Sequence, residues 1–167
     1  MYKLDFKNKI HVYFIGIGGI SMSGMAELLH KEGFTISGSD NQQNAITKHL
    51  ESLGITIFYG KESKNITTSY DLVVYTAAIH ENNPEFAQAK ALNLPMLNRA
   101  QLVGQVMKNY DTAIAVSGTH GKTTTTSMLS MMMLEGNLDP TISVGGILEA
   151  IHGNIRIGNS KNFITEA

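Results

Sequence analysis

The sequence predicts an α/β fold: a Rossmann-like, doubly wound and mostly parallel sheet, followed by the truncated start of a second α/β domain. Short apolar runs rich in β-branched residues alternate along the chain with longer amphipathic stretches. Two glycine-rich segments, residues 16–21 and 118–124, each connect such a run to a helical pattern. Strands separated by helices need crossover connections, which place a mostly parallel sheet between two helical layers.

The first unit is expected to span residues 1–107, with strands and helices in alternation. Apolar runs predict strands at residues 11–16, 35–37, 56–59, 72–75 and 96–97. Apolar residues at helical spacing predict helices at residues 21–32, 45–53, 84–92 and 101–108. Gly33 and Gly54 are helix stop signals, and Pro84 suits the first turn of the third helix. The polar residues 108–111 are the expected linker.

A second unit is expected over residues 112–167. Its predicted elements are a strand at residues 112–117, a helix at 122–135, and further strands at 142–144 and 163–165. Because these elements are too few to close a sheet with both faces covered, we expect an incomplete domain for ATP binding. The strand at 163–165 would then expose an apolar edge, so self-association through this unit is expected.

Charge and composition exclude several classes of function. Lys and Arg number 13 and Asp and Glu number 14, for a formal net charge of −1, so no basic surface for nucleic acid is expected. The chain has no cysteine, which excludes disulfides, thiolate metal sites and a cysteine nucleophile. The first residues lack the apolar core of a secretory signal, and no apolar run approaches the ~18 residues that cross a bilayer. A soluble cytoplasmic protein with no membrane partner is expected.

The strongest chemical signal lies at residues 118–124, between a predicted strand and a predicted helix. Such a loop directs backbone N–H groups and a helix N-terminus at phosphate oxygens. Lys122 would place a positive charge on the outer phosphates, and the Thr123 hydroxyl would hold Mg²⁺. Val116 stands where the usual G-x-x-x-x-G-K-[ST] pattern has its first glycine, so a plain strand-to-helix turn is the alternative. The candidate phosphate-binding residues are Gly118, Thr119, His120, Gly121, Lys122, Thr123 and Thr124.

A second glycine-rich loop follows the first predicted strand. Residues 16–21 read Gly-Ile-Gly-Gly-Ile-Ser, which is similar to a dinucleotide fingerprint except that Ser21 occupies the third glycine position. Asp40 follows the second predicted strand, where an acidic residue would meet a ribose. A tight turn without a ligand, with Asp40 as a helix cap, is the alternative. The loop predicts a phosphate-bearing ligand; an NAD-dependent oxidoreductase would leave the loop at 118–124 unexplained.

A third signal is Glu166, which directly follows the last predicted strand. If that strand runs parallel to the strand at 112–117, the carboxylate lies at the same end of the sheet as the phosphate loop. A carboxylate in that position can complete a Mg²⁺ site. The alternative is an acidic side chain that is simply solvated.

Together these residues resemble the Mur ligases. Residues 115–126 (AVSGTHGKTTTT) are similar to the phosphate loop of that superfamily and of the related folylpolyglutamate synthases. Further segments resemble the UDP-N-acetylmuramate–L-alanine ligase family, MurC, in the same order along the chain: residues 23–27, 37–40, 76–79, 82–85 and 98–100. A parallel recycling family, which attaches a tripeptide to the same sugar, has a similar phosphate loop but typically a different first glycine loop.

The resemblance implies domains for a UDP-sugar, for ATP and for closure over both, of which this chain would hold the first and the opening of the second. It implies that the first loop holds a UDP-sugar rather than NAD. Lys122 would be the catalytic lysine on the β- and γ-phosphates of ATP, with Thr123 and Glu166 as Mg²⁺ ligands. Glu166 and Ala167 would begin a family motif of the form E-A-x-E-S-D. The implied UDP-sugar-binding residues are Gly18, Gly19, Ile20, Ser21, Met22, Ser23, Ser39, Asp40, Thr76, Ala77 and Ala78.

The implied reaction is the ATP-dependent ligation of L-alanine to UDP-N-acetylmuramate in bacterial peptidoglycan precursor synthesis. The lactyl carboxylate would attack the γ-phosphate of ATP, and the amine of L-alanine would attack the resulting acyl phosphate. The partners are then UDP-N-acetylmuramate, L-alanine and ATP, with ATP and Mg²⁺ as cofactors. The L-alanine and adenine sites would lie beyond Ala167, so we expect this chain to bind the UDP-sugar without ligating it. A nucleotide-sugar binding module without chemistry is the alternative.

Overall fold

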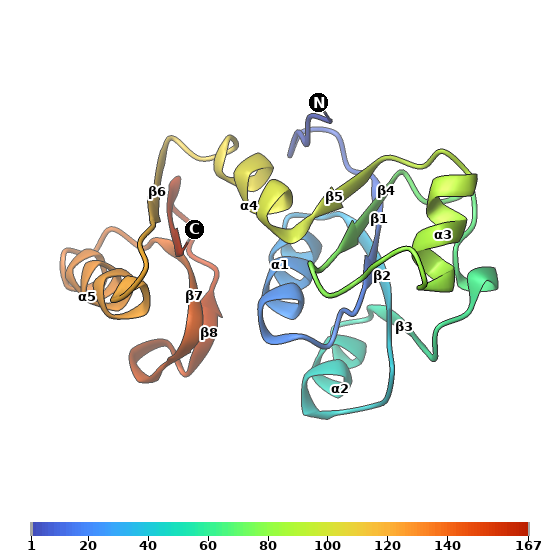
Figure 1. Ribbon diagram of the computed structural model, residues 1–167. Helices are drawn as coiled ribbons and strands as arrows, with labels where there is room; N and C mark the ends of the chain where they lie inside the picture. The colour runs from blue at the N-terminus through green and yellow to red at the C-terminus, as the bar shows by residue number, and fades with distance from the viewer. Residues whose placement is uncertain (1, 167) are drawn as a thin grey trace. The chain divides into compact units, whose positions relative to one another are not determined.

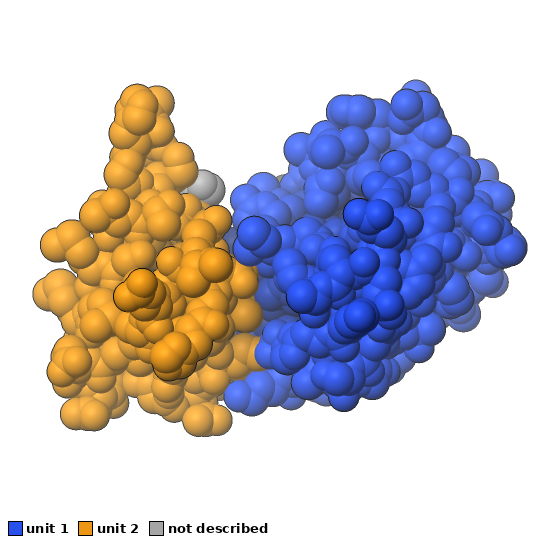
Figure 2. All heavy atoms as spheres, turned by 90° about the horizontal axis from the view of Figure 1, so that it is seen from below, with its two compact units in different colours: residues 1–105 blue, residues 106–167 orange. Residues whose placement is uncertain are grey.

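The computed structural model describes residues 2–166 of the chain. The chain divides into two compact units, residues 1–105 and 106–167, which are coloured separately in Figure 2. Each unit has a sheet of its own, drawn with its helices in Figure 1. None of the helices in the described part of the chain is long and apolar enough to cross a membrane.

Unit 1 is built on a parallel, five-stranded sheet in the order β3-β2-β1-β4-β5, which confirms the predicted doubly wound α/β fold. The chain moves outward from β1 through β2 to β3, and then returns to β4 and β5 on the other side of β1. This reversal places the switch point of the fold between β1 and β4, where α/β sheets commonly bind ligands. The strands are β1 (His11–Ile15), β2 (Thr35–Asp40), β3 (Thr56–Tyr59), β4 (Leu72–Tyr75) and β5 (Met96–Asn98).

Helices connect these strands, and α1 and α3 lie on opposite sides of the sheet in Figure 1. A capping box starts α2, in which Asn44 and Thr47 exchange side-chain and backbone hydrogen bonds. Asn83 caps α3, which begins at Pro84 as predicted. The helices are α1 (Ile20–Lys31), α2 (Ala45–Ser52), α3 (Pro84–Ala91) and α4 (Arg99–Met107), with a short 3-10 helix η1 (Ser63–Asn65).

The core of unit 1 occupies both faces of the sheet. Tyr13 and Ile15 of β1 pack in one cluster with Phe86 of α3. Val12 and Phe14 alternate with them along the strand and are also fully buried. Because both faces are covered, the central strand reads as a continuous apolar run rather than an alternating one.

Unit 2 contains a four-stranded sheet in the order β6-β9-β7-β8. β9 is parallel to both β6 and β7, whereas β8 is antiparallel to β7. Met133 of α5 packs with Ile142 and Val144 of β7 and Ile164 of β9 in the core of this unit. The elements are β6 (Thr112–Val116), α5 (Lys122–Glu135), β7 (Thr141–Leu148), η2 (Glu149–Ile151), β8 (Gly153–Arg156) and β9 (Asn162–Glu166).

Unit 2 differs from the sequence-based expectation in two ways. β8 was not expected; it forms because β7 continues through Gly145 and Gly146 and pairs with it. The strand at 163–165 is not an exposed edge, since β9 lies between β6 and β7 and its middle residues are buried. The edge strands of this sheet within residues 2–166 are β6 and β8. β9 therefore does not provide the exposed apolar edge that was expected to cause self-association.

Candidate functional site

The loop that joins β6 to α5 contains two backbone conformations that favour glycine. Gly118 has φ 156° and Gly121 has φ 74°, which residues with a Cβ rarely adopt. Gly121 is the N-cap of α5, so the N-terminus of this 14-residue helix opens onto the loop. A helix N-terminus presents N–H groups and a positive dipole end, both of which attract anions. The loop therefore has the backbone features expected of a phosphate-binding turn.

Lys122 is the first residue of α5, and its side chain folds back over the loop. Its Nζ donates a hydrogen bond of 2.5 Å to the carbonyl of Gly118. The ammonium group thus lies among backbone groups that a bound phosphate would meet. A phosphate oxygen in place of the carbonyl would give this ammonium group an ionised acceptor, so that the hydrogen bond joins two opposite charges. The other predicted side chains of this loop are exposed: Thr119, His120, Thr123 and Thr124.

Glu166 lies at the end of β9, next to the strand that leads into this loop. β9 is parallel to β6, as the prediction required, and Glu166 is in register with Val116. Glu166 Oε1 accepts a hydrogen bond of 2.9 Å from the N–H of Gly145. A Cβ at Gly145 would lie 2.6 Å from Glu166 Oε2, so the carboxylate occupies the space that a side chain would need.

Thr123 approaches the neighbouring glycine from α5. A Cβ at Gly146 would lie 3.7 Å from Thr123 Cγ2, so Thr123 and Glu166 flank adjacent residues of β7. A hydroxyl and a carboxylate are hard oxygen donors, and Mg²⁺ typically takes one or two carboxylates together with water and substrate phosphates. Among residues 2–166 no group of three or more His, Asp and Glu side chains is placed to hold a metal. Thr123 and Glu166 thus supply the donor types that Mg²⁺ takes when it is also bound to phosphate.

In unit 1, the glycine-rich loop between β1 and α1 is fastened to the end of β2. The N–H groups of Gly16 and Ile17 both donate to the carbonyl of Ser39, at 2.8 and 2.9 Å. The N–H of Gly18 donates to Asp40 Oδ2 at 2.8 Å. All three N–H groups are therefore bonded to the protein itself, including that of Gly18, which is a predicted UDP-sugar-binding residue.

The next residues of this loop open α1. The side chain of Met22 belongs to the core, and Ser23 Oγ donates to the carbonyl of Ile20. Ser21 Oγ accepts a hydrogen bond of 3.0 Å from Arg99, which brings a guanidinium group to the start of α1. No sequence motif assigns a role to this arginine. The exposed positions of the loop are Gly19 and Ile20.

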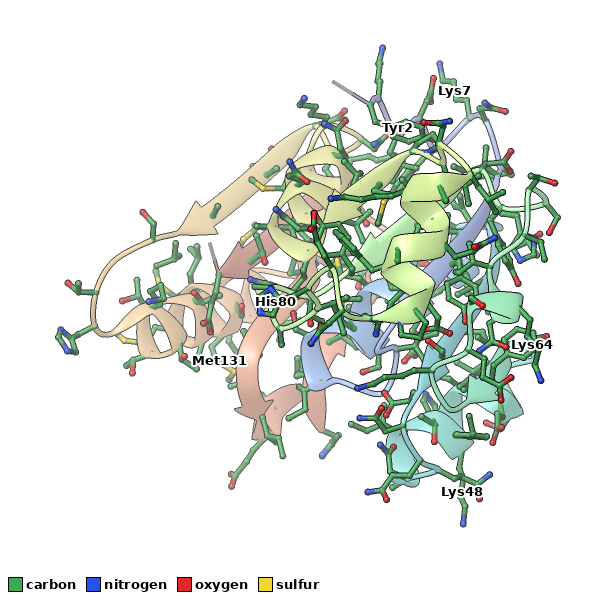
Figure 3. All side chains as sticks on the ribbon, turned by 45° about the vertical axis from the view of Figure 1, so that its right-hand side comes forward. Tyr2, Lys7, Lys48, Lys64, His80 and Met131 are labelled. Carbon is green, nitrogen blue, oxygen red and sulfur yellow. The ribbon has the colours of Figure 1, made fainter. Side chains whose placement is uncertain are left out.

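The connection after β4 reaches the same edge of the sheet. Ile15 of β1 is in register with Ser39 of β2 on one side and with Tyr75 of β4 on the other. Residues 76–78, which follow Tyr75, therefore lie at the carboxyl edge with the glycine-rich loop and Asp40. His80, labelled in Figure 3, lies further along this connection. The fold thus brings together three segments that the resemblance assigns to one ligand.

A pocket of about 210 Å³ lies at this edge. Three of its lining residues are predicted site residues, namely Ser39, Asp40 and Ala78. Lys61, in the connection after β3, also lines it, and no motif marks that lysine. Other lining residues are Ile15, Gly16, Asn41, Ile79, Asn83 and Glu85. Two of these fall in residues 82–85, a segment that carries the family resemblance but has no predicted role.

Glu85 is a fully buried carboxylate in the wall of this pocket. Its Oε1 accepts hydrogen bonds from the Tyr13 hydroxyl and from Asn65 Nδ2, each of 2.9 Å. Its Oε2 accepts one of 2.6 Å from Ser39 Oγ. Burial, with a smaller contribution from the Glu85 charge, raises the pKa of Tyr13 well above its ordinary value. The Tyr13 hydroxyl therefore keeps the proton that it donates.

Asn83 is the second polar residue of the wall that the sequence did not single out. Its Oδ1 accepts from the N–H groups of Glu85 and Phe86, which fixes the orientation of its amide. Its Nδ2 is buried and has no hydrogen-bond partner among the described residues. The pocket wall therefore contains a carboxylate that accepts three hydrogen bonds. It also contains a buried amide N–H group that has no acceptor among the described residues.

The sequence of the chain is similar to those of known ligases. Residues 11–111 match the Mur ligase family, catalytic domain. The chain is 66% identical to the UDP-N-acetylmuramate–L-alanine ligase of Agathobacter rectalis and 64% identical to that of Lachnoclostridium phytofermentans. Each alignment covers 100% of this chain and 36% of the relative, so the chain spans about a third of the length of these proteins.

Two solved structures share the fold of the chain. The UDP-N-acetylmuramate-alanine ligase MurC from Thermotoga maritima matches with a TM-score of 0.81 and 34% identity, over 94% of this chain and 36% of that one. The UDP-N-acetylmuramate:L-alanyl-γ-D-glutamyl-meso-diaminopimelate ligase from Neisseria meningitides matches with a TM-score of 0.83 and 29% identity, over 96% and 53%. The similarity extends over both units.

Proposed function

This chain belongs to the Mur ligase family, and on that premise we propose that the whole protein is an ATP-dependent ligase that joins L-alanine to UDP-N-acetylmuramate in peptidoglycan precursor synthesis. The proposal is carried by one observation: the chain has two separate ligand-type sites. The phosphate-type loop of unit 2 contains Lys122 and Thr123 and lies beside Glu166, and unit 1 has a pocket at its own glycine-rich loop. Two such sites fit a reaction with two nucleotide substrates. The 66% identity to an L-alanine ligase supports the choice of amino acid.

In unit 2, residues 118–124 would bind the phosphates of ATP. Lys122 Nζ would exchange the Gly118 carbonyl for oxygens of the β- and γ-phosphates. Thr123 and Glu166 would hold Mg²⁺, which when bound offsets phosphate charge and polarises the γ-phosphoryl group. The Gly145 N–H orients the Glu166 carboxylate before any ligand arrives.

In unit 1, the UDP-sugar would lie across residues 18–23, the end of β2 and residues 76–78. Because Gly16, Ile17 and Gly18 donate to β2, the diphosphate would lie further along, at the exposed start of α1. There the helix N-terminus and Arg99 together supply positive potential. The pocket beside Asp40 and Ala78 would take another part of the same ligand.

The proposed chemistry needs no covalent bond to the protein. The lactyl carboxylate of the UDP-sugar attacks the γ-phosphate of ATP, which gives an acyl phosphate and ADP. The amine of L-alanine then attacks the acyl carbon, and phosphate leaves. The protein contributes by positioning the reactants and by placing Lys122 where negative charge develops.

The recycling ligase that adds a tripeptide is the second candidate, because such an enzyme from Neisseria meningitides matches this chain with a TM-score of 0.83. The full-length protein can be assayed for ADP release with UDP-N-acetylmuramate and ATP, with either L-alanine or the tripeptide as acceptor. Turnover with L-alanine alone supports the proposal. Turnover with the tripeptide alone would assign the chain to the recycling enzyme.

The substrate site of unit 1 is tested by calorimetric titration of the 167-residue chain with UDP-N-acetylmuramate, and separately with NAD and MgATP. We expect saturable binding of the UDP-sugar and no response to NAD. We also expect no ADP release from the chain by itself, because it spans 36% of the relatives' length. Binding of NAD without binding of the UDP-sugar would refute the proposal for the first loop.

A further inference from the structure

We propose that Glu85 is a positioning residue of the UDP-sugar site, which fixes the glycine-rich loop through Ser39. The inference rests on the proposed function of unit 1 for its effect on binding. The carboxylate of Glu85 is fully buried and connects three segments through hydrogen bonds. The donors come from Tyr13 of β1, Ser39 of β2 and Asn65 of η1.

Ser39 transmits this arrangement to the loop. Its side-chain hydroxyl donates to Glu85 Oε2 at 2.6 Å, while its backbone carbonyl accepts from the N–H groups of both Gly16 and Ile17. The following residue, Asp40, accepts from the N–H of Gly18. The end of β2 is therefore hydrogen-bonded to Glu85 through the Ser39 side chain and to the glycine-rich loop through the Ser39 carbonyl. A shift of Ser39 would move the acceptor of two loop amides.

The energetics of burial point to a role beyond packing. A buried carboxylate is costly unless its oxygens are hydrogen-bonded, and an apolar residue of similar size is often no less stabilising at such a position. No ion pair to Glu85 is present within residues 2–166, so its charge is stabilised by three neutral donors and by its place in the first turn of α3. What the carboxylate provides that an apolar residue would not is a fixed acceptor for Ser39.

Geometry and charge can be separated by substitution. Glu85→Gln keeps an acceptor for Tyr13 and Asn65 and presents an amide to Ser39, whose hydroxyl can accept as well as donate. Glu85→Ala removes the acceptor of Tyr13 and Ser39 and one of the two acceptors of Asn65 Nδ2, which also donates to the carbonyl of Gly60. A positioning role therefore predicts loss in Glu85→Ala and substantial rescue in Glu85→Gln. Glu81→Ala is the matched control, because Glu81 is an exposed carboxylate of the same region that forms a surface ion pair with Lys90.

The first test measures the loop directly and needs no ligand. Amide hydrogen exchange of the 167-residue chain is followed by NMR for Gly16, Ile17 and Gly18. In Glu85→Ala we expect exchange at these amides to rise at least tenfold, with amides of unit 2 unchanged. Glu85→Gln and Glu81→Ala should stay within about threefold of the parent chain. Unchanged exchange at the loop in Glu85→Ala would overturn the proposal, even if the melting temperature falls.

The second test measures the Kd for UDP-N-acetylmuramate by calorimetry, well below the melting temperature of each variant. We expect Glu85→Ala to raise Kd at least tenfold and Glu85→Gln to restore it to within about threefold. A purely structural role would lower the melting temperature and leave the Kd of the folded protein unchanged, which would refute the inference. If the parent chain itself does not bind, the proposed function fails, whereas the exchange measurement still decides on Glu85.

Ser39→Ala serves if Glu85→Ala does not fold. It deletes only the hydroxyl that joins β2 to Glu85 and keeps the carbonyl that Gly16 and Ile17 use. Faster exchange at these two amides in Ser39→Ala supports the transmission through Ser39. Exchange equal to that of the parent chain would contradict it.

Discussion

Gly145 and Glu166 are joined by a hydrogen bond of 2.9 Å from the glycine N–H to the glutamate carboxylate, although 21 residues separate them in sequence. The contact holds the carboxylate at the end of β9 against β7, beside the loop that leads into α5. It also accounts for glycine at position 145, where a Cβ would lie 2.6 Å from the second carboxylate oxygen. The proposed metal ligand is thus oriented by the backbone of a neighbouring strand.

Gly145→Ala should weaken binding of MgATP in the full-length protein at least tenfold, because the new methyl group displaces Glu166. We expect a stability cost of about 1–3 kcal/mol, typical of overpacking. Gly146→Ala is the matched control, since its Cβ would meet its nearest neighbour at an ordinary 3.7 Å. Equal Kd values for MgATP in the two variants, measured by calorimetry, would contradict the assigned role of Glu166.

Lys122→Ala should abolish most turnover in the full-length protein and leave UDP-sugar binding intact. Loss of one positioned donor to a developing charge typically lowers kcat by about 10²–10³. Lys161→Ala, which removes an exposed lysine from the same unit, should have no effect on kcat. A steady-state ADP-release assay measures kcat for each variant. A normal kcat in Lys122→Ala would refute the assignment of this loop to ATP.

Gly18→Ala should raise the Kd of the chain for UDP-N-acetylmuramate at least tenfold. Its Cβ would lie 2.7 Å from Asp40 Oδ2 and 2.9 Å from Thr47, so the loop must move away from β2. Calorimetric titration of the 167-residue chain measures the change. Binding that matches the parent chain would show that the ligand does not depend on this contact between the loop and Asp40.

Gly104→Ala should stabilise the chain. Gly104 lies within α4, and a Cβ there would meet no heavy atom within 4 Å. Alanine in place of glycine in a helix interior is favoured by about 0.5–1 kcal/mol, because the unfolded chain loses conformational freedom. Chemical denaturation should show a higher midpoint with an unchanged m-value. A lower midpoint would mean that the helix needs glycine at this position.

Asp139 should make the stability of unit 2 depend on pH in the acid range. Hydrogen bonds from the Asn159 backbone, the Arg156 guanidinium and the Asn159 side chain lower the pKa of Asp139 to about 2. Since the folded pKa lies below the unfolded value of about 3.9, the ionised carboxylate stabilises the fold above about pH 4, and this is lost as the pH falls through about 2.

Asp139→Asn is therefore expected to lower the melting temperature at pH 7 and to flatten its decline between about pH 4 and pH 2. Melting temperatures across this range give the comparison. Asp111→Asn, which changes an exposed carboxyl of the same unit, is the control. The same decline in Asp139→Asn as in the parent chain would show that another carboxyl controls the acid transition.

Much of the fold follows from local patterns. The strand at His11–Ile15 is a continuous apolar run, Pro84 begins α3, and Lys122 begins α5 directly after a glycine. Each of these signals acts through the backbone of a few neighbouring residues, so the sequence carries it without tertiary contacts. The same holds for the two glycine-rich loops, since their position after a strand and before a helix is itself a local pattern.

Other features depend on residues far apart in the chain. β8 exists because β7 continues through Gly145 and pairs with it, and β9 is buried because two strands from earlier in the chain flank it. Glu85 reads as an ordinary helix-start acid, and its burial becomes evident only where Tyr13, Ser39 and Asn65 meet.

The sequence by itself therefore determined the α/β order, the two loops and the residue types that suit phosphate and Mg²⁺. Tertiary structure alone decided which strands are neighbours, which loop amides are already bonded, and that Glu85 lies at the centre of a buried network. The physical reason is that strand pairing and side-chain burial depend on contacts between distant segments, whereas backbone conformation and hydrophobic periodicity are set by neighbours in the chain.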